Sequence, residues 1–438
     1  MELSGVEALT ESKRDEPLLL HSSLADPALR SVQVLNEIMS RHPTAISFAP
    51  GAPDLGHLDD TAVNHYLGVY QTYLARERGL SDQRIRRLLH EYGPSQGIIN
   101  ELIAGALTRD LGVAVSPEAV VVTVGAQEAM LLVLRALCRS RQDVLAVTNP
   151  CYVGIVGAAR LLDIPLVAVP ETEAGIDTQA LERACAVARS QGRRIRAVYV
   201  APDFANPSGV CCRTDVRETL LAVARQEDLL VLEDSAYAFT APTAGVPPSL
   251  KAMTGGDRVV HLGTFAKTCL PGARVGYVVA DQRFYDDRGG GTLSEALALL
   301  KGMVTVNTSP ICQGIIGGML LAHGGSMAAL GQARAGVYQR NLDHLLAALG
   351  RHLPPGSGVT WNRPQGGFFV RLRTPVVADY GLLELAASRF GVLWMPMSAF
   401  HLDGSGRNDI RLSCSYLTPP QIDEGVRRLA DFVTEVTG

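Results

Sequence analysis

Asp234 and Lys267 are the residues whose types and surroundings most clearly suggest chemistry. Asp234 follows the apolar run Leu229–Leu232, and burying a carboxylate there is costly unless a cation lies beside it. A protonated pyridine nitrogen would be one such cation, and an arginine in an ordinary ion pair would be another. Lys267 ends the short segment Thr264–Lys267, where partial desolvation would lower the pKa of its amine and favour imine formation. The alternative for Lys267 is a surface position.

Lysine is scarce in this sequence. It occurs only at positions 13, 251, 267 and 301, so 36 of the 40 basic residues are arginine. A mechanism that requires a lysine therefore has few candidates.

Residues near predicted strand ends could hold an anion. The turn Gly125-Ala126-Gln127 opens a predicted helix, and a helix N-terminus presents free N–H groups and a partial positive charge that suit a phosphate. The Thr264 hydroxyl and the planar guanidinium of Arg274 could bind the same group. An ordinary strand–helix turn is the alternative for residues 125–127.

Four more side chains suggest the recognition of a flat ring and a carboxylate. Tyr152 could stack on a ring, Asn206 in the turn Asn206-Pro-Ser-Gly209 could hydrogen-bond a phenolate oxygen, and Tyr237 could reach the same ring. Arg411 follows Ile410 in a predicted strand and could clamp a carboxylate with both guanidinium nitrogens. The alternatives are a packed loop aromatic, a surface turn and an edge-strand charge. No Cys/His cluster has metal-binding spacing, so no metal is expected.

The elements that position these residues alternate between short apolar strands and helical patterns. This alternation predicts an α/β fold with a mainly parallel, helix-covered sheet, whose sites lie at strand ends. The predicted strands are Val120–Val124, Val144–Thr148, Pro165–Val169, Ala197–Val200, Leu229–Leu232 and Val259–Leu262, with Val275–Ala280 as an antiparallel addition. The helices between them include Ala126–Ser140, Thr178–Gln191 and Asp215–Glu227.

The chain divides into three predicted parts. Residues 1–45 form an N-terminal arm with one helix, Ala28–Arg41, and residues 46–325 form a large domain, of which 46–60 associate with the small domain. Residues 326–438 form a smaller α+β domain. Residues 60–112 and 293–350 are helical in pattern, and Gly289–Gly291 is expected at the tip of a surface loop.

Composition excludes other classes of protein. The net charge of −4 and the absence of a basic run argue against nucleic-acid binding. The sequence contains no stretch of about eighteen apolar residues, so no membrane span is predicted. Met1–Pro17 lacks the apolar core of a signal peptide. A cytoplasmic protein with reduced cysteines is therefore expected.

Together, the motifs resemble those of the class I/II aminotransferases, pyridoxal-phosphate (PLP) enzymes of the aspartate-aminotransferase fold (fold type I). The resemblance extends from about Ile46 to the C-terminus. Asn206, Asp234 and Lys267 follow one another at intervals of 28 and 33 residues. The other marks are Tyr92-Gly-Pro-Ser-Gln-Gly97, Asp234-x-x-Tyr237, Gly263–Lys267 with Pro271–Arg274, Gly366-Gly-Phe368 and Ile410-Arg-Leu412.

The resemblance implies a role for each candidate. Lys267 would carry PLP as a Schiff base and move the α-proton, with Asp234 at the pyridine nitrogen. Asn206 and Tyr237 would bond the ring oxygen, and Tyr152 would stack on the ring. The phosphate would be held by Gly125, Ala126, Gln127, Thr264 and Arg274, and by Tyr92 of a neighbouring subunit, which implies a homodimer with shared sites. The substrate carboxylate would meet Arg411, Gly51 and Asn206.

Three features depart from the family pattern. Ala266 replaces the usual serine before the lysine, which removes one phosphate hydroxyl and costs about 1 kcal/mol. Pro396-Met397 replaces the usual Pro-Gly and changes the wall of the substrate pocket. The segment Leu55–His90 is long and carries His57, Asp59 and Asp60, which are either a substrate-facing insert or solvated turn residues.

Three hypotheses of function follow. The first is an aminotransferase that works between an L-amino acid and a 2-oxo acid. The second is a PLP enzyme of specialised metabolism that performs β/γ-elimination, replacement, cyclisation or C–C bond formation. The third and most remote is a non-catalytic PLP-sensing module, which would need a DNA-binding domain of roughly 60 residues. Only about 45 residues precede the family resemblance.

Overall fold

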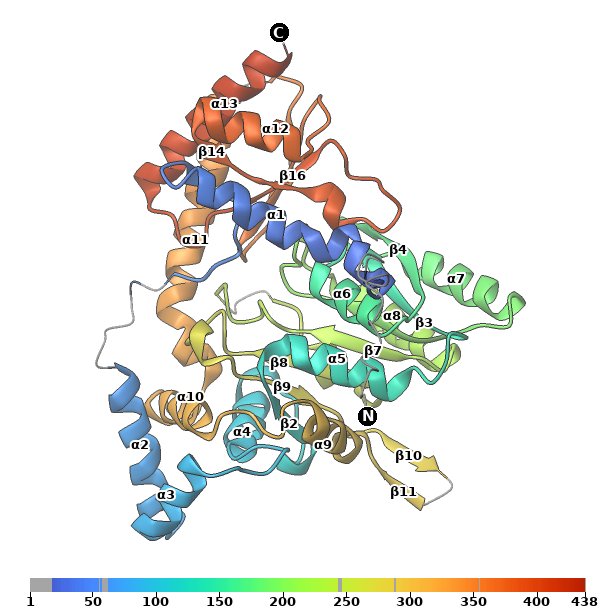
Figure 1. The fold of residues 1–438 in the computed structure, drawn as a ribbon, viewed down its shortest axis with the longest axis vertical. Helices are drawn as coiled ribbons and strands as arrows, with labels where there is room; N and C mark the ends of the chain where they lie inside the picture. The colour runs from blue at the N-terminus through green and yellow to red at the C-terminus, as the bar shows by residue number, and fades with distance from the viewer. Residues whose placement is uncertain are drawn as a thin grey trace, which may run out of the picture.

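A mixed eight-stranded sheet forms the centre of the molecule (Figure 1). The computed structural model describes residues 18–54, 56, 62–242, 246–286, 289–353 and 355–437. The strand order is β2 (Val120–Thr123), β9 (Gly276–Val279), β8 (Val259–Thr264), β7 (Leu230–Asp234), β6 (Arg194–Val200), β3 (Asp143–Asn149), β4 (Leu166–Thr172) and β5 (Gly175–Ile176). The strands from β8 to β4 are parallel, whereas β9 runs antiparallel to β2 and β8. The predicted mainly parallel sheet and its antiparallel addition are confirmed.

Helices cover both faces of this sheet because its strands are apolar on both sides. Leu145 and Val147 of β3 pack with the helices α5 (Gly125–Leu137), α6 (Val153–Leu161) and α9 (Leu293–Val304). Val144 and Ala146, the alternate residues, pack with α7 (Thr178–Ser190) and α8 (Thr214–Gln226) on the other face. Each fully buried aliphatic side chain contributes about 1.5–3 kcal/mol, so this two-sided burial stabilises the sheet at whose strand ends the site is built.

A second, antiparallel sheet forms the C-terminal lobe, at the top of Figure 1. Its order is β12 (Thr360–Trp361), β13 (Phe369–Arg373), β16 (Asp409–Ser413) and β15 (Met395–Pro396). The helices α11 (Met327–His352), α12 (Tyr380–Leu385) and α13 (Pro419–Thr437) pack against it.

The N-terminal part of the described chain belongs to the same core. Strand β1 (Ile46–Ser47) pairs in parallel with β14 (Val392–Leu393). Helix α1 (Pro27–Arg41) buries Leu35 and Ile38 in the core of this lobe and lies between the lobe and α6 (Figure 1). The predicted boundaries between domains remain predictions.

The segment 62–111 folds as three helices beside the central sheet. These are α2 (Ala62–Arg76), α3 (Asp82–His90) and α4 (Asn100–Leu111), with α10 (Pro310–Ala322) packed on α2. Gly318 of α10 permits this close approach, since a Cβ there would lie 1.8 Å from the Tyr66 carbonyl oxygen. His57, Asp59 and Asp60 lie outside the described residues.

The expectation of a loop tip at Gly289–Gly291 was wrong. These glycines lie in strand β11 (Gly289–Thr292), which pairs with β10 (Arg283–Asp286) in a hairpin that projects from the body (Figure 1). A Cβ at Gly290 would lie 2.7 Å from the Tyr285 ring, and a Cβ at Gly291 would lie 3.3 Å from the Phe284 ring. Aromatic rings that cover glycines on the paired strand stabilise such a ribbon.

Within the described ranges, no single helix is long and apolar enough to cross a membrane. Helices α10 and α11 meet that criterion only as a pair bent by 86°.

Candidate active site

A cavity of about 480 Å³ opens where the ends of β6, β7 and β8 meet the C-terminal lobe and α1. Most of the predicted site residues line it: Gly51, Ala126, Gln127, Tyr152, Asn206, Asp234, Tyr237, Thr264, Lys267, Arg274 and Arg411. Gly125 lies against the guanidinium of Arg274, since a Cβ at Gly125 would lie 2.6 Å from Arg274 Nη2. Tyr92 does not line this cavity and is 89% exposed.

Lys267 points into the cavity, so the alternative of a surface lysine is wrong. Its Nζ donates to the Gly51 carbonyl oxygen at 2.8 Å. Burial lowers the pKa of Lys267 to about 8, and the charge of Arg411 acts in the same direction. The other lysines that the structure describes are buried in ion pairs, Lys251 with Asp281 and Lys301 with Glu128. Lys267 is therefore the described lysine that can act as a nucleophilic amine.

Asp234 is a buried carboxylate at the end of β7. Its Oδ2 accepts a hydrogen bond from the Tyr199 hydroxyl at 2.5 Å, and its Oδ1 accepts one from the Ala236 N–H at 3.1 Å. Burial raises the pKa of Asp234, and these two hydrogen bonds oppose that rise. Among the described residues, no arginine pairs with this carboxylate, so the predicted alternative of an arginine ion pair is wrong.

The start of α5 forms an anion cradle. Gly125 has a φ of +74°, and the first N–H groups of α5 have no capping side chain. Ala126 and Gln127 at this end of the helix line the cavity, where such N–H groups suit an anion. The Arg274 Nη2 would lie 2.6 Å from a Cβ at Gly125, which shows how closely the guanidinium approaches this turn. The Thr264 hydroxyl lines the same end of the cavity. This donor set fits a phosphate dianion.

Aromatic side chains shape the middle of the cavity. The Tyr152 hydroxyl accepts from Gln127 Nε2 at 3.1 Å. The Tyr237 ring meets Phe369 edge-on, with ring centroids 5.4 Å apart, and burial raises the pKa of Tyr237, so its hydroxyl remains a donor. Gly51 is required beside these rings, because a Cβ there would lie 2.8 Å from Phe369 Cζ.

Arg411 is a buried guanidinium without a carboxylate partner among the described residues. Its Nη1 donates to Asn206 Oδ1 at 2.6 Å and its Nη2 to the Ala49 carbonyl oxygen at 2.5 Å, while Nε has no partner. Burial lowers its pKa to about 10. The alternative of an edge-strand charge is wrong, since β16 lies between β13 and β15. An uncompensated buried guanidinium is suited to a substrate carboxylate.

Several residues of this cavity were not predicted from the sequence. Tyr199, which bonds Asp234, was hidden inside an apolar strand, where a tyrosine is indistinguishable from core. Leu35 and Asn36 of α1 line the cavity, as do Met395 and Phe400. Met397 of the unusual Pro396-Met397 pair is buried outside this lining. No group of three or more His, Cys, Asp or Glu side chains in the described part of the chain is arranged to hold a metal ion.

Fold and site together define a PLP-dependent transferase of fold type I. The phosphate cradle, the carboxylate at the ring position and the lysine of low pKa are the groups that this cofactor requires. Residues 62–429 match the family described as aminotransferase class I and II, and the chain belongs to that family. It is therefore a PLP-dependent aminotransferase, as the first of the three hypotheses stated.

Known relatives are similar to this chain over nearly its whole length. An (S)-3,5-dihydroxyphenylglycine transaminase of Amycolatopsis orientalis is 46% identical over 95% of this chain and 94% of its own length. A 2-aminoadipate transaminase of Thermus thermophilus is 30% identical over 89% of this chain and 90% of its own. The crystal structure of a kynurenine aminotransferase from Pyrococcus horikoshii in complex with PMP is 25% identical, has a TM-score of 0.79 and covers 93% of this chain and 94% of its own.

Proposed function

We propose that the protein transfers the amino group of an L-amino acid with a hydroxylated aryl side chain to a 2-oxo acid, with Lys267 as the Schiff-base lysine. The observation that carries this proposal is the buried Arg411, whose charge has no carboxylate partner among the described residues and which lines one cavity with Lys267. A substrate carboxylate at Arg411 would direct its α-carbon toward the amine of Lys267.

The chain's own residues divide the work. When bound, PLP supplies an electron sink for the amino group that is moved. Asp234 provides a negative charge at the position of the pyridine nitrogen, and the α5 N-terminus with Arg274 anchors the phosphate. Lys267, with a pKa of about 8, is suited both to accept and to return a proton at the α-carbon near neutral pH. Arg411 holds the substrate carboxylate through either half of the reaction.

The lining of the cavity favours an aryl side chain over a second carboxylate. Leu35, Val153, Met395 and Phe400 are among its apolar lining residues. The cations among the described lining residues are Lys267, Arg274 and Arg411, and each already has a role. A second substrate carboxylate would therefore be buried without a partner.

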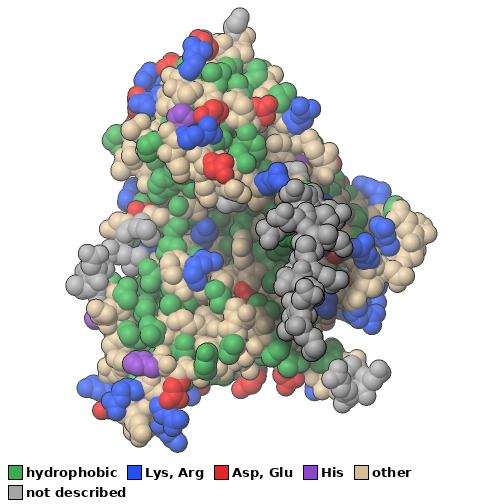
Figure 2. All heavy atoms as spheres, viewed as in Figure 1, with side chains coloured by type: hydrophobic (Ala, Val, Ile, Leu, Met, Phe, Trp, Pro, Cys, Tyr) green, Lys and Arg blue, Asp and Glu red, His purple; other side chains and the backbone are tan. Residues whose placement is uncertain are grey.

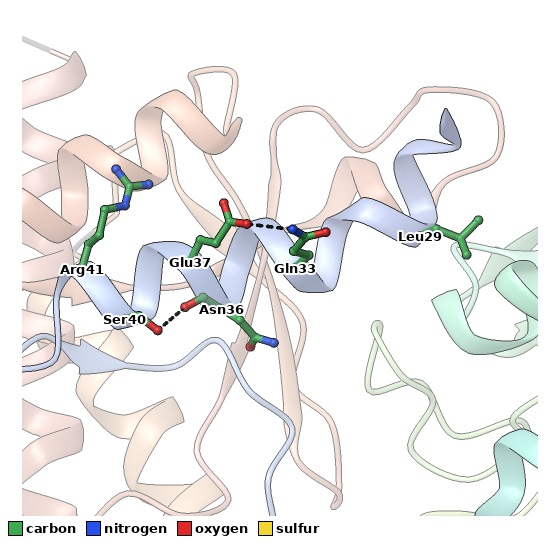
Figure 3. A pocket seen from close by; sticks show the side chains of 6 residues that line it. All are labelled: Leu29, Gln33, Asn36, Glu37, Ser40 and Arg41. Carbon is green, nitrogen blue, oxygen red and sulfur yellow. Dashed lines mark hydrogen bonds between the residues drawn. The ribbon is translucent and has the colours of Figure 1, made fainter. Parts of the chain in front are cut away.

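Asn36 is the polar group that could recognise a ring hydroxyl. It lines the cavity and also the groove on the outer face of α1 shown in Figure 3. In that view its side chain extends away from Glu37 and Arg41, which lie on the other side of the helix. The relative from Amycolatopsis orientalis is named for a dihydroxylated arylglycine, which agrees with a largely apolar cavity in which Asn36 is the amide without an assigned cofactor or substrate-carboxylate role.

The substrate is tested by comparing kcat/KM for 3,5-dihydroxyphenylglycine, phenylglycine, aspartate and 2-aminoadipate. We expect the first to be preferred, and Asn36→Leu to reduce its advantage over phenylglycine by about tenfold, the value of one hydrogen bond. Gln33→Leu, on the outer groove, is the control and leaves that ratio unchanged. A preference for aspartate or 2-aminoadipate would contradict the aryl proposal and leave the aminotransferase assignment intact.

We further propose a homodimer in which Tyr92 reaches the partner's phosphate site. Tyr92 is 89% exposed, and Leu299, Met303 and Val304 of α9 are also exposed. Figure 2 shows hydrophobic side chains on the face that carries α9 and α10. Such a patch on a protein surface marks an interface.

Subunit mixing tests this arrangement. Tyr92→Ala subunits keep Lys267, and Lys267→Ala subunits keep Tyr92, so each alone is impaired. If Tyr92 serves the partner's site, each mixed dimer regains one intact site, and random exchange restores about a quarter of the sites. No restoration after confirmed exchange would show that Tyr92 does not act across the interface.

We retain a cytoplasmic location as a proposal. All eight cysteines are free thiols, as expected for a reducing compartment. Recovery of the protein with a secreted rather than a cytoplasmic marker on cell fractionation would contradict it.

A further inference from the structure

Tyr199 is a buried tyrosine of β6. Its ring packs in the core, but neither the strand nor the packing requires its hydroxyl group. Tyr199 lies in register with Leu232 of β7, so its side chain emerges on the same face as Asp234, two residues further along β7. Tyr199 is 1% exposed and Asp234 is 5% exposed. Strand pairing therefore directs the phenol toward the carboxylate.

The hydrogen bonds of this pair leave acceptor sites of Asp234 free for a ligand. Asp234 Oδ2 accepts from the Tyr199 hydroxyl at 2.5 Å and Oδ1 from the Ala236 N–H at 3.1 Å. A carboxylate accepts about four hydrogen bonds, and Asp234 lines the cavity. Its remaining lone pairs can face a ligand while the two donors fix the plane of the group.

The charge states of the pair are set by burial. Burial raises the pKa of Asp234, and the Tyr199 hydrogen bond is the foremost influence that opposes this rise. Burial and the charge of Asp234 together keep the pKa of Tyr199 well above its usual value. Tyr199 therefore remains a donor at every working pH, and its hydrogen bond favours the ionised carboxylate.

We propose that Tyr199 is a positioning residue of the aminotransferase reaction, whose hydroxyl holds Asp234 ionised and oriented so that the pyridine nitrogen of the cofactor stays protonated. The inference rests on the placement of Asp234 at that nitrogen and extends it by one residue. Tyr199 need not touch the substrate. Its effect passes through Asp234, because a protonated ring is the better electron sink.

The test is Tyr199→Phe, which removes the hydroxyl and keeps the ring. The holoenzyme is reconstituted with PLP labelled with ¹⁵N at the ring nitrogen, and its ¹⁵N chemical shift is followed against pH. We expect the shift of the variant to move toward that of an unprotonated pyridine, kcat to fall about tenfold to a hundredfold, and KM to change little. The melting temperature of the apoprotein reports whether the variant folds.

Tyr277→Phe is the matched control. Tyr277 is another tyrosine buried in the central sheet, and its hydroxyl bonds only the Met327 sulfur, at 3.6 Å, among the described residues. In the Tyr277→Phe holoenzyme, the ¹⁵N shift of the ring nitrogen and kcat should equal those of the unmodified protein. A wild-type ¹⁵N titration in Tyr199→Phe would overturn the proposal, even if kcat fell. An unprotonated ring nitrogen in the unmodified holoenzyme would overturn the role of Asp234 itself, and with it this inference.

Discussion

Arg411 donates through Nη1 to the side-chain oxygen of Asn206 at 2.6 Å, although 205 residues separate the two in the chain. The bond joins a strand of the C-terminal lobe to the loop after β6. It couples the group suited to a substrate carboxylate to the amide suited to a ring oxygen. The two groups therefore hold each other in place on the wall of one cavity.

Arg411→Gln should lower kcat/KM for both the amino acid and the 2-oxo acid roughly a hundredfold, equivalent to about 3 kcal/mol for a lost buried ionic hydrogen bond. A steady-state assay in both directions measures this loss. An amine without a carboxylate should react equally slowly with variant and unmodified protein. Arg373→Gln, an exposed arginine of β13 (71% exposed side chain), is the control and should have no effect. Equal losses for the amine and the amino acid would contradict the carboxylate role.

Lys267→Ala should abolish covalent cofactor attachment and reduce turnover by at least about a thousandfold, because the nucleophile and the proton carrier are lost together. Borohydride reduction followed by peptide mass spectrometry locates the pyridoxyl group in the unmodified protein. The tag should be found on the peptide that contains Lys267. A tag on Lys251 or Lys301 would show that the assignment is wrong.

Capture of PLP by the apoprotein should follow the ionisation of Lys267. Because its pKa is about 8, the fraction of free amine, and with it the capture rate, should rise about tenfold per pH unit below 8 and level off above it. With an unperturbed lysine, the capture rate would keep rising until about pH 10.4. Stopped-flow absorbance from pH 6 to 10 distinguishes these profiles.

The same pKa shift affects the stability of the apoprotein. Between about pH 8 and 10.4 the unfolded chain still binds the proton that the folded chain has lost, so the free energy of unfolding rises with pH through this window. Lys267→Met should lack that contribution. Parallel urea titrations of the two apoproteins measure the difference, and identical slopes would contradict the lowered pKa.

Gly125→Ala should weaken PLP binding, because Gly125 has a φ of +74° and a Cβ there would lie 2.6 Å from Arg274 Nη2. Equilibrium dialysis of the apoprotein measures this change. Gly336→Ala is the matched control, since a Cβ at this position in α11 meets nothing within 4 Å. It should leave PLP affinity unchanged and raise the free energy of unfolding by about 0.5–1 kcal/mol.

The predictable part of the fold is the part with two-sided burial. Runs such as Val144–Thr148 are apolar at every position because helices cover both faces of β3, and that pattern is legible in the sequence. The spacing of Asn206, Asp234 and Lys267 likewise predicted which residues meet at the strand ends. The hairpin at Gly289–Gly291 was not predictable, because its stability depends on the rings of Phe284 and Tyr285 across the register.

The site residues that were not predicted reach the cavity only because segments distant in the sequence pack together. Tyr199 sits in an apolar strand, and only the register of β6 against β7 shows that its hydroxyl meets Asp234. The amphipathic pattern of α1 predicts a helix but does not say that Leu35 and Asn36 reach the substrate cavity.

The burial of Lys251 and Lys301 in ion pairs also bears on how this protein can be labelled. Across the described residues, the surface offers no lysine to an amine-reactive dye or cross-linker. In the apoprotein near pH 8, the accessible amine of low pKa in this part of the chain is Lys267 itself. Lys13 lies outside the described residues, so the readout is the peptide that contains Lys267: its acylation, measured by mass spectrometry with and without PLP, would count functional sites.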